Sequence, residues 1–194
     1  MSKSSNLSTH KKTMNNLSST CWRKFDKNAE ELLFGDLMPT KKRSWNEKLN
    51  ESTGLPRVEK ITDKMSKKWG EGTVVIPAPI EVDEIMRGIP PGKLTTINDI
   101  RFALAKKHKA TIGCPMTTGI FAWIAAYAAD ERKQRGEKNI TPYWRTLKSG
   151  GLLNEKYPGG FEAHKLLLEK EGHTIAAKGK KFRVLNYEKS LIHM

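Results

Sequence analysis

The chain has 194 residues, enough for one ordinary domain with tails, and its hydrophobic content of 37% is below the roughly 45–50% of an average globular protein. Lys and Arg outnumber Asp and Glu by 35 to 21, a formal net charge of +14 that favours an anionic partner. The two cysteines, Cys21 and Cys114, lie far apart with no Cys or His at ligand spacing, which excludes a disulfide scaffold and a zinc site and suits a reducing compartment.

The first 72 residues are divided into two segments. Residues 1–20 are rich in Ser, Thr and Asn and predict a disordered tail; they lack the apolar core of a signal peptide, so we expect a cytoplasmic location, at the nucleoid if the chain is bacterial. Residues 21–72 are interpreted as a basic N-terminal extension whose tryptophans dock in part on the domain, residues 73–194. The most apolar run, residues 119–129, is about half of the roughly 20 residues that a membrane span needs, so no membrane partner is expected.

The domain is predicted to open with a short strand and a short helix. Residues 73–77 begin as a β-branched run and end at the first proline of a Pro-Ala-Pro sequence, which indicates a strand. In residues 81–87 three apolar side chains fall on one helical face, and Gly88 follows, which indicates a helix that stops there.

Two further helices have stronger local signals. Thr96 and Asp99 have the spacing of a capping box, so a helix is predicted to start there and to continue towards Lys109. After a linker through residues 113–115, a longer helix is predicted over residues 117–135. A helix, a connection and a longer helix are the layout of a helix-turn-helix, although this pattern alone is common.

Positive charge is concentrated in the same part of the chain. Residues 71–100 have two basic and five acidic side chains, whereas residues 101–150 have ten basic and three acidic ones. An excess of +7 (ten minus three) beside a candidate helix-turn-helix favours contact with DNA phosphates.

The C-terminal part predicts one more helix, over residues 161–171 with Gly172 after it, and a basic β-hairpin over residues 173–185. The hairpin is either a wing that contacts phosphates or a solvated edge, and the residues leave both interpretations open.

Several motifs, taken in order, resemble the DNA-binding domain of the methylated-DNA–protein-cysteine methyltransferases, the alkylguanine-DNA alkyltransferases. Residues 89–96 (Ile-Pro-x-Gly-Lys-Leu-x-Thr) are similar to the segment that leads into the family's helix-turn-helix, and Pro115 matches the Pro at the start of its recognition helix. Residues 142–145 (Pro-Tyr-Trp-Arg) align with the family's active-site Pro-Cys-His-Arg. Residues 157–160 (Tyr-x-Gly-Gly) and 167–172 (Leu-Leu-x-x-Glu-Gly) match its closing motifs at the family's own spacing.

The resemblance covers roughly residues 85–173, less than half of the chain. It implies an α+β, mostly helical fold: a winged-helix-like (helix-turn-helix) alkyltransferase DNA-binding domain with a C-terminal β-hairpin. It also implies double-stranded DNA, alkylated in the family's own reaction, as the partner, and neither a cofactor nor a metal.

The residues that perform the family's chemistry are replaced. In the family a cysteine thiolate accepts the alkyl group and is activated through a His that a Glu orients. Tyr143 stands at the position of that cysteine and Trp144 at the position of that His, so Glu171 is expected to have nothing to orient. A phenol with a pKa of about 10 and no adjacent base is a poor nucleophile at pH 7. Gly119 stands where the family inserts an Arg into the base stack, and Ile97 stands where it has a Tyr that rotates a phosphate.

The candidate site has two parts. The candidate pocket residues would either stack on a base or fill the vacated cavity as core; they are Pro142, Tyr143, Trp144, Tyr157 and Glu171. The candidate DNA contacts are Thr96, Thr117, Thr118, Gly119, Arg145, Lys148 and Ser149. Three histidines without a partner at ligand spacing are interpreted as surface residues: His108, His164 and His173.

Three functions are compatible with these residues. The leading one is non-enzymatic DNA binding of the alkyltransferase-like type, with recognition of alkylated DNA in DNA repair. The second is transcriptional or architectural DNA binding by a winged helix. The third is a methylated-DNA–protein-cysteine methyltransferase that uses Cys114, because a helix N-terminus can activate a thiol. A preference for alkylated DNA separates the first from the second, and stoichiometric methyl uptake identifies the third.

Overall fold

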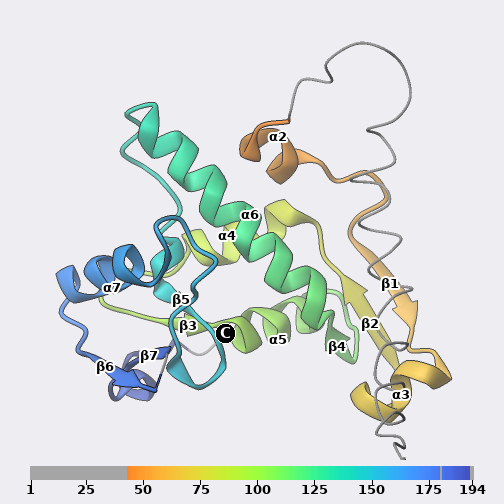
Figure 1. The fold of residues 1–194 in the computed structure, drawn as a ribbon. Helices are drawn as coiled ribbons and strands as arrows, with labels where there is room; N and C mark the ends of the chain where they lie inside the picture. Colours follow the sequence, from red (N-terminus) through yellow and green to blue (C-terminus); the bar gives the residue numbers. More distant parts are fainter. Residues whose placement is uncertain (1–42, 180, 193–194) are drawn as a thin grey trace, which may run out of the picture. The chain divides into compact units, whose positions relative to one another are not determined.

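The computed structural model describes residues 43–179 and 181–192 and shows an α+β fold with more helix than strand (Figure 1). At this level the predicted fold class is confirmed. The predicted disordered tail, residues 1–20, and residues 21–42 of the predicted extension lie outside the described residues. Within the described part, no helix is long and apolar enough to cross a membrane.

The main core surrounds the long helix α6 (Pro115–Gln134), which packs against α2 (Trp45–Asn50), α4 (Pro79–Arg87) and α5 (Ile97–Lys107) (Figure 1). Small side chains on the buried side of α6 let the neighbouring helices come close. These are Ala122, Ala125, Ala126, Ala128 and Ala129. Larger buried side chains from the other helices fill the space between them: Leu49, Val82, Met86, Ile100 and Leu104.

The predicted helices are confirmed, and their starts follow local chemistry. α5 begins at the predicted capping box, in which the Thr96 side chain accepts from the Asp99 N–H and the Asp99 carboxylate accepts from the Thr96 N–H. α4 and α6 each begin two residues earlier than predicted, at Pro79 and Pro115. A proline is favourable there, because the N–H that it lacks has no partner within the first turn. The predicted helix over residues 161–171 is α7 (Gly160–Lys170).

A three-stranded sheet in the order β1-β2-β4 lies at the N-terminal end of α6 (Figure 1). β1 (Arg57–Lys60) and β2 (Thr73–Ile76) are antiparallel and are connected through α3 (Asp63–Trp69). β4 (Ile112–Gly113) pairs in parallel with β2 and leads directly into α6. β2 confirms the predicted strand, whereas β4 forms within the connection between α5 and α6, where no strand was predicted.

A second, smaller core lies between α7 and the C-terminal strands. β3 (Thr95–Thr96) pairs in parallel with β5 (Thr146–Leu147), and β6 (Ile175–Lys178) pairs antiparallel with β7 (Lys181–Val184). β6 and β7 confirm the predicted C-terminal hairpin. The buried residues of this core are Leu94, Leu147, Leu153, Leu168 and Val184.

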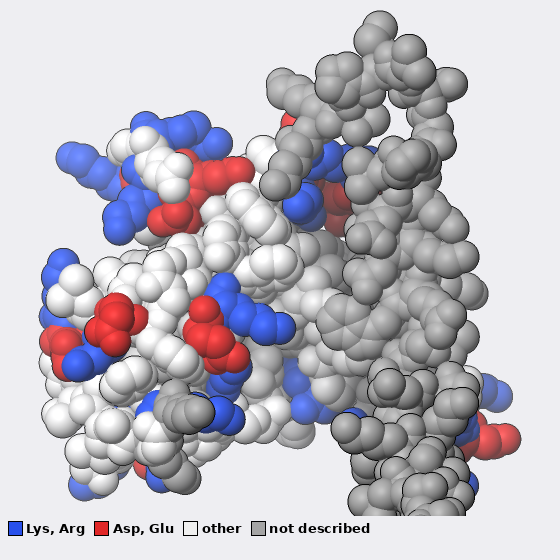
Figure 2. All heavy atoms as spheres, viewed as in Figure 1, with Lys and Arg blue, Asp and Glu red and all other residues white. Residues whose placement is uncertain are grey.

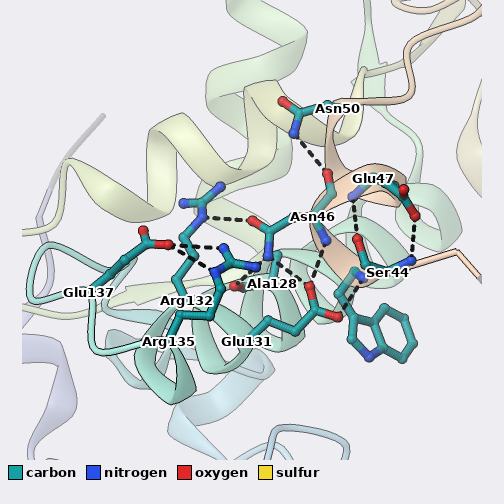
Figure 3. A network of polar contacts seen from close by, with 10 residues as sticks. Ser44, Asn46, Glu47, Asn50, Ala128, Glu131, Arg132, Arg135 and Glu137 are labelled. Atoms are coloured by element: carbon teal, nitrogen blue, oxygen red, sulfur yellow. Dashed lines mark hydrogen bonds and ion pairs between the residues drawn. The ribbon is translucent and has the colours of Figure 1, made fainter.

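Residues 43–72, assigned to the N-terminal extension, contribute α2, β1 and α3. Glu131 of α6 holds the start of α2: its carboxylate accepts from the backbone N–H groups of Trp45 and Asn46 at 2.9 and 3.0 Å, and from the Asn46 side chain at 2.7 Å (Figure 3). The Asn46 side chain also accepts from Arg132 Nε at 2.7 Å. α2 therefore packs on α6, while the domain boundaries themselves stay a prediction.

Candidate functional site

The candidate pocket is built on the 3-10 turn η2 (Tyr143–Arg145), which directly follows the buried Pro142. The residue before that proline attaches the turn to α4, because the buried Thr141 hydroxyl donates to the Asp83 carboxylate at 2.6 Å. The Arg145 N–H closes the turn on the Pro142 carbonyl oxygen at 3.0 Å. These bonds place the three side chains of η2 on a fixed backbone.

Glu171, which follows α7, is the centre of a polar cluster. Its carboxylate accepts from Trp144 Nε1 at 2.7 Å, from Arg145 Nε and Nη2 at 2.7–3.0 Å, and from the Gly92 N–H at 3.2 Å. Arg145 also donates from Nη1 to the Ile89 carbonyl oxygen at 2.6 Å. The expectation that Glu171 has nothing to orient is therefore wrong, because it binds both the indole of Trp144 and the guanidinium of Arg145.

Glu171 is paired with an indole, which differs chemically from the imidazole of a proton relay. Burial acts to raise the pKa of Glu171, but hydrogen bonds from Arg145, Trp144 and the Gly92 N–H outweigh it and leave the pKa lowered. Glu171 is therefore an anion at neutral pH. Its indole partner is a donor only and cannot accept a proton, so Trp144 cannot act as a general base that passes a proton to Glu171.

Tyr143 and Tyr157 lie in the packed interior. They are 3% and 2% exposed, and their ring centroids are 5.4 Å apart in an edge-to-face arrangement. Trp144, also 5.4 Å from Tyr143, is only half-buried. Burial raises the pKa of Tyr143 to about 12, so its phenol stays protonated at neutral pH. Among the candidate pocket residues, Trp144 and Glu171 thus keep exposed surface, whereas the two tyrosines contribute to the core.

His164 belongs to this site, and its interpretation as a surface residue is wrong. It is 0% exposed; its Nδ1 accepts from the Asn154 N–H at 3.1 Å, and its Nε2 donates to the Trp144 carbonyl oxygen at 2.8 Å. Burial lowers the pKa of His164 to about 4, against the effect of its backbone hydrogen bonds. The neutral ring therefore positions the backbone of η2. Its partners lie 10 and 20 residues away, so no local spacing signals this role.

The three threonines predicted to contact DNA are buried. Thr96, Thr117 and Thr118 are 7%, 6% and 0% exposed. Thr96 caps α5, and the Thr118 hydroxyl donates to the Cys114 carbonyl oxygen at 2.8 Å. The Thr117 hydroxyl has no hydrogen-bond partner among the described residues. Capping and bonding within the helix account for two of these side chains, and their contact with DNA stays a prediction.

Gly119 lies near the start of α6, with free space beside it. A Cβ atom built at this position would meet no heavy atom within 4 Å, and the residue is half-buried. Packing therefore does not require a glycine here. Because Gly119 has no side chain, another molecule can approach the helix surface closely at this position.

The remaining candidate DNA contacts are bonded to neighbours. Arg145 forms an ion pair with Glu171, and Lys148 forms an ion pair with Glu155. The Ser149 hydroxyl accepts from the side chain of Asn98 at 2.8 Å. This last bond attaches the loop after β5 to the first turn of α5, and both of its side chains are exposed.

The positive charge of residues 101–150 is partly neutralised in the fold. Four of the ten basic side chains form ion pairs with glutamates: Lys107 with Glu81, Arg135 with Glu137, Arg145 with Glu171 and Lys148 with Glu155. Figure 2 shows Lys and Arg mixed with Asp and Glu over the C-terminal end of α6, beside a largely uncharged surface. The sum of +7 therefore overstates the positive charge that this region presents.

Phe102 on α5 was not singled out by its sequence pattern, yet it is 64% exposed. It lies two residues after the buried Ile100 and two residues before the buried Leu104, which puts it on the opposite side of the helix. Asn98 and Lys106, four residues away in each direction, share that side and are exposed. The signal that could have found it is a large apolar residue outside the apolar face of its helix.

Cys114, the alternative alkyl acceptor, is 5% exposed and occupies the N-cap position of α6. Its backbone N–H donates to the Val75 carbonyl oxygen of β2 at 2.9 Å. The thiol is therefore enclosed where β4 meets α6 and is not presented to a ligand.

No protein-family model matches the chain, and no curated protein matches it in sequence. Two solved structures from S. pombe are similar to it, one of ATL in complex with DNA and one of Atl1 in complex with damaged DNA containing O6-carboxymethylguanine. Each is 20% identical, with TM-scores of 0.44 and 0.42 respectively. The similarity covers 60% of this chain and 94% of each of those chains.

Proposed function

We propose that this protein binds double-stranded DNA and recognises alkylated bases in DNA repair without transferring the alkyl group, as an alkyltransferase-like protein. α5 and α6 would act as a helix-turn-helix of the winged-helix type, with the start of α6 against the DNA. The proposal requires neither a cofactor nor a membrane, and it fits a cytoplasmic location, at the nucleoid if the chain is bacterial.

The cluster around Glu171 is the observation that carries this proposal. It joins three segments that the resemblance selected from the sequence: a carbonyl and an N–H from residues 89–96, an indole and a guanidinium from residues 142–145, and the carboxylate from residues 167–172. Motifs that matched separately along the chain therefore meet in one bonded site. This supports the resemblance for the residues that surround the candidate pocket.

The chemistry of the site supports binding rather than alkyl transfer. Nucleophilic attack needs a deprotonated acceptor and a base to create it. Tyr143 is buried with a pKa of about 12, and the Glu171 carboxylate accepts hydrogen bonds from Trp144, Arg145 and the Gly92 N–H. Cys114 offers no substitute, because its thiol is enclosed.

We expect the full chain to bind a short duplex with a logarithm of affinity that falls linearly with the logarithm of salt concentration, by about 0.9 for each phosphate contacted. A duplex containing one O6-alkylguanine should bind more tightly than the same duplex with guanine. Fluorescence anisotropy over a series of salt concentrations measures both. Binding that is absent at low salt, or that does not depend on salt, would contradict the proposal.

A second candidate, architectural or transcriptional DNA binding, is favoured by the packing of Tyr143 and Tyr157 at the candidate pocket positions. A site filled by its own aromatic side chains offers less room to an extruded base. Equal affinity for the alkylated and the unmodified duplex would select this candidate.

Alkyl transfer should be absent from the wild type and should stay absent in Tyr143→Cys. The new thiol would be buried, since this position is 3% exposed, and Trp144 cannot act as its base. The combination Tyr143→Cys with Trp144→His should also fail, because Gly119 offers no side chain to hold an extruded base out of the stack. The measurement is the label retained on the protein after incubation with a duplex carrying a labelled methylguanine. Label on the wild type that Cys114→Ala removes would instead establish the methyltransferase alternative.

A further inference from the structure

A group of exposed lysines lies on β1 and α3, outside the segment that carries the family resemblance. We define the α3 lysine surface as Lys60, Lys64, Lys67 and Lys68, all of which are exposed. None of the ion pairs between described residues includes any of them. The three lysines of α3 are spaced i, i+3 and i+4 and therefore share one side of the helix.

The local charge balance leaves this surface positive. Residues 57–72 have five basic and three acidic side chains, and one of each, Arg57 and Glu59, are paired. Like charges on one side of a helix repel each other in the absence of an anion. A polyanion would remove this repulsion and would release its own counterions on binding.

The sheet fixes the α3 lysine surface to the start of α6 (Figure 1). β2, which follows α3, pairs with β4, and the residue after β4 is Cys114, the N-cap of α6. The bond from the Cys114 N–H to the Val75 carbonyl oxygen closes this connection. The lysines therefore lie at the end of α6 that the proposed function places against DNA.

A second set of contacts keeps the loop between α3 and β2 in place. The backbone N–H of Thr73 donates to the Thr111 hydroxyl at 3.0 Å, and the N–H of Thr111 donates to the Thr73 hydroxyl at 3.1 Å. Gly72 has a φ of +123°, and a Cβ there would lie 2.2 Å from Thr111 Oγ1, so a side chain would not fit. The surface is therefore attached to the connection between α5 and α6 both before and after β4.

We propose that the α3 lysine surface is a second DNA contact, which binds phosphates of the duplex that α6 engages. This inference rests on the proposed function and extends it to residues outside the resemblance. Neighbouring strands lie about 4.8 Å apart, so β4 and β1 are separated by about 10 Å. Duplex DNA has one phosphate charge per about 1.7 Å of its axis, so about six phosphate charges fall within that distance along one duplex.

The test compares two double variants of the full chain. Lys64→Ala with Lys68→Ala removes two charges from one side of α3 and introduces the residue with the best helix propensity. The matched control is Lys133→Ala with Lys138→Ala, two exposed lysines at the far end of α6, where Lys133 is about 27 Å from the helix start. Affinity for one unmodified duplex is measured by anisotropy over a series of salt concentrations, with melting temperatures as a check on folding.

We expect the slope of log affinity against log salt concentration to become less steep by about 0.9 in the α3 variant for each phosphate contact removed. At 0.1 M salt this corresponds to an affinity about eightfold weaker per contact. Its hydroxyl-radical footprint should also become shorter on one side, whereas the control should keep the wild-type slope and footprint. If the wild type binds and both variants behave alike, the second contact is wrong while the proposed function stands. If the wild type itself does not bind, the proposed function fails as well.

Discussion

Replacing Glu171 with alanine should lower the free energy of unfolding by about 3–5 kcal/mol, because the change leaves a largely buried guanidinium without its counter-ion. The side chains of Arg145 and Glu171 are 11% and 15% exposed, so water reaches neither freely. The same change also removes the acceptor for the Trp144 indole and for the Gly92 N–H. Urea unfolding of wild type and variant, followed by tryptophan fluorescence, measures the difference.

Two control variants distinguish the stability loss caused by disrupting the Glu171 cluster from the loss expected when an ordinary exposed ion pair is removed. Glu155→Ala removes the partner of Lys148 in an exposed pair, with side chains 37% and 44% exposed, and should cost less than about 1 kcal/mol. Glu171→Gln keeps an oxygen that can accept from the indole and should fall between the other two. A Glu171→Ala loss no larger than that of Glu155→Ala would show that the cluster does not hold the site together.

Elements with a local signal could be predicted from the sequence. The Thr96–Asp99 capping box specifies the start of α5 within four residues of chain, and Gly136, which has a φ of +84°, follows the end of α6. The antiparallel pairing of β6 and β7 is equally local, because the two strands are close together along the chain. In each case the residues that determine the structure are neighbours in sequence.

Elements that depend on distant partners could not be predicted. α2 is held by Glu131, which lies 86 residues after Trp45. β4 has only two residues and no period to detect. It lies close against α5, where a Cβ at Gly113 would lie 2.5 Å from the Arg101 carbonyl oxygen and only glycine fits. Such contacts exist only in the folded chain.

In the candidate site too, some features could be predicted from the sequence and others depend on the folded chain. The alignment with the family's motifs identified Trp144 and Glu171 as candidate pocket residues. In the structure a hydrogen bond of 2.7 Å joins them. Alignment could not reveal that Tyr143 is buried, or that Arg145 is already neutralised by a carboxylate. Burial is a property of the whole fold, so a residue's type and its spacing do not report it.

The buried His164 should make the stability of the protein depend on pH in a defined window. Its folded-state pKa of about 4 lies below the ordinary histidine value of 6.5, because burial disfavours the charged ring. Between these values the unfolded chain binds a proton that the folded chain does not, so the free energy of unfolding rises with pH. The stability is complete above pH 6.5 and decreases as the pH falls towards 4, by about 3 kcal/mol in total at 1.36 kcal/mol per unit.

Urea unfolding at about pH 7, 5.5 and 4.5 tests this dependence. His164→Gln should be less stable than the wild type at neutral pH, because the imidazole bridges Asn154 and Trp144, and it should show a much flatter pH dependence. His173→Gln is the matched control: burial also lowers the pKa of His173, but this residue is only half-buried, so most of the slope should persist without it. Burial acts to raise the pKa of the Glu171 carboxylate, but hydrogen bonds from Arg145 and Trp144 outweigh it, so this pKa is lowered. A His164→Gln variant with the wild-type slope would contradict the assignment of His164 as the buried neutral group that positions η2.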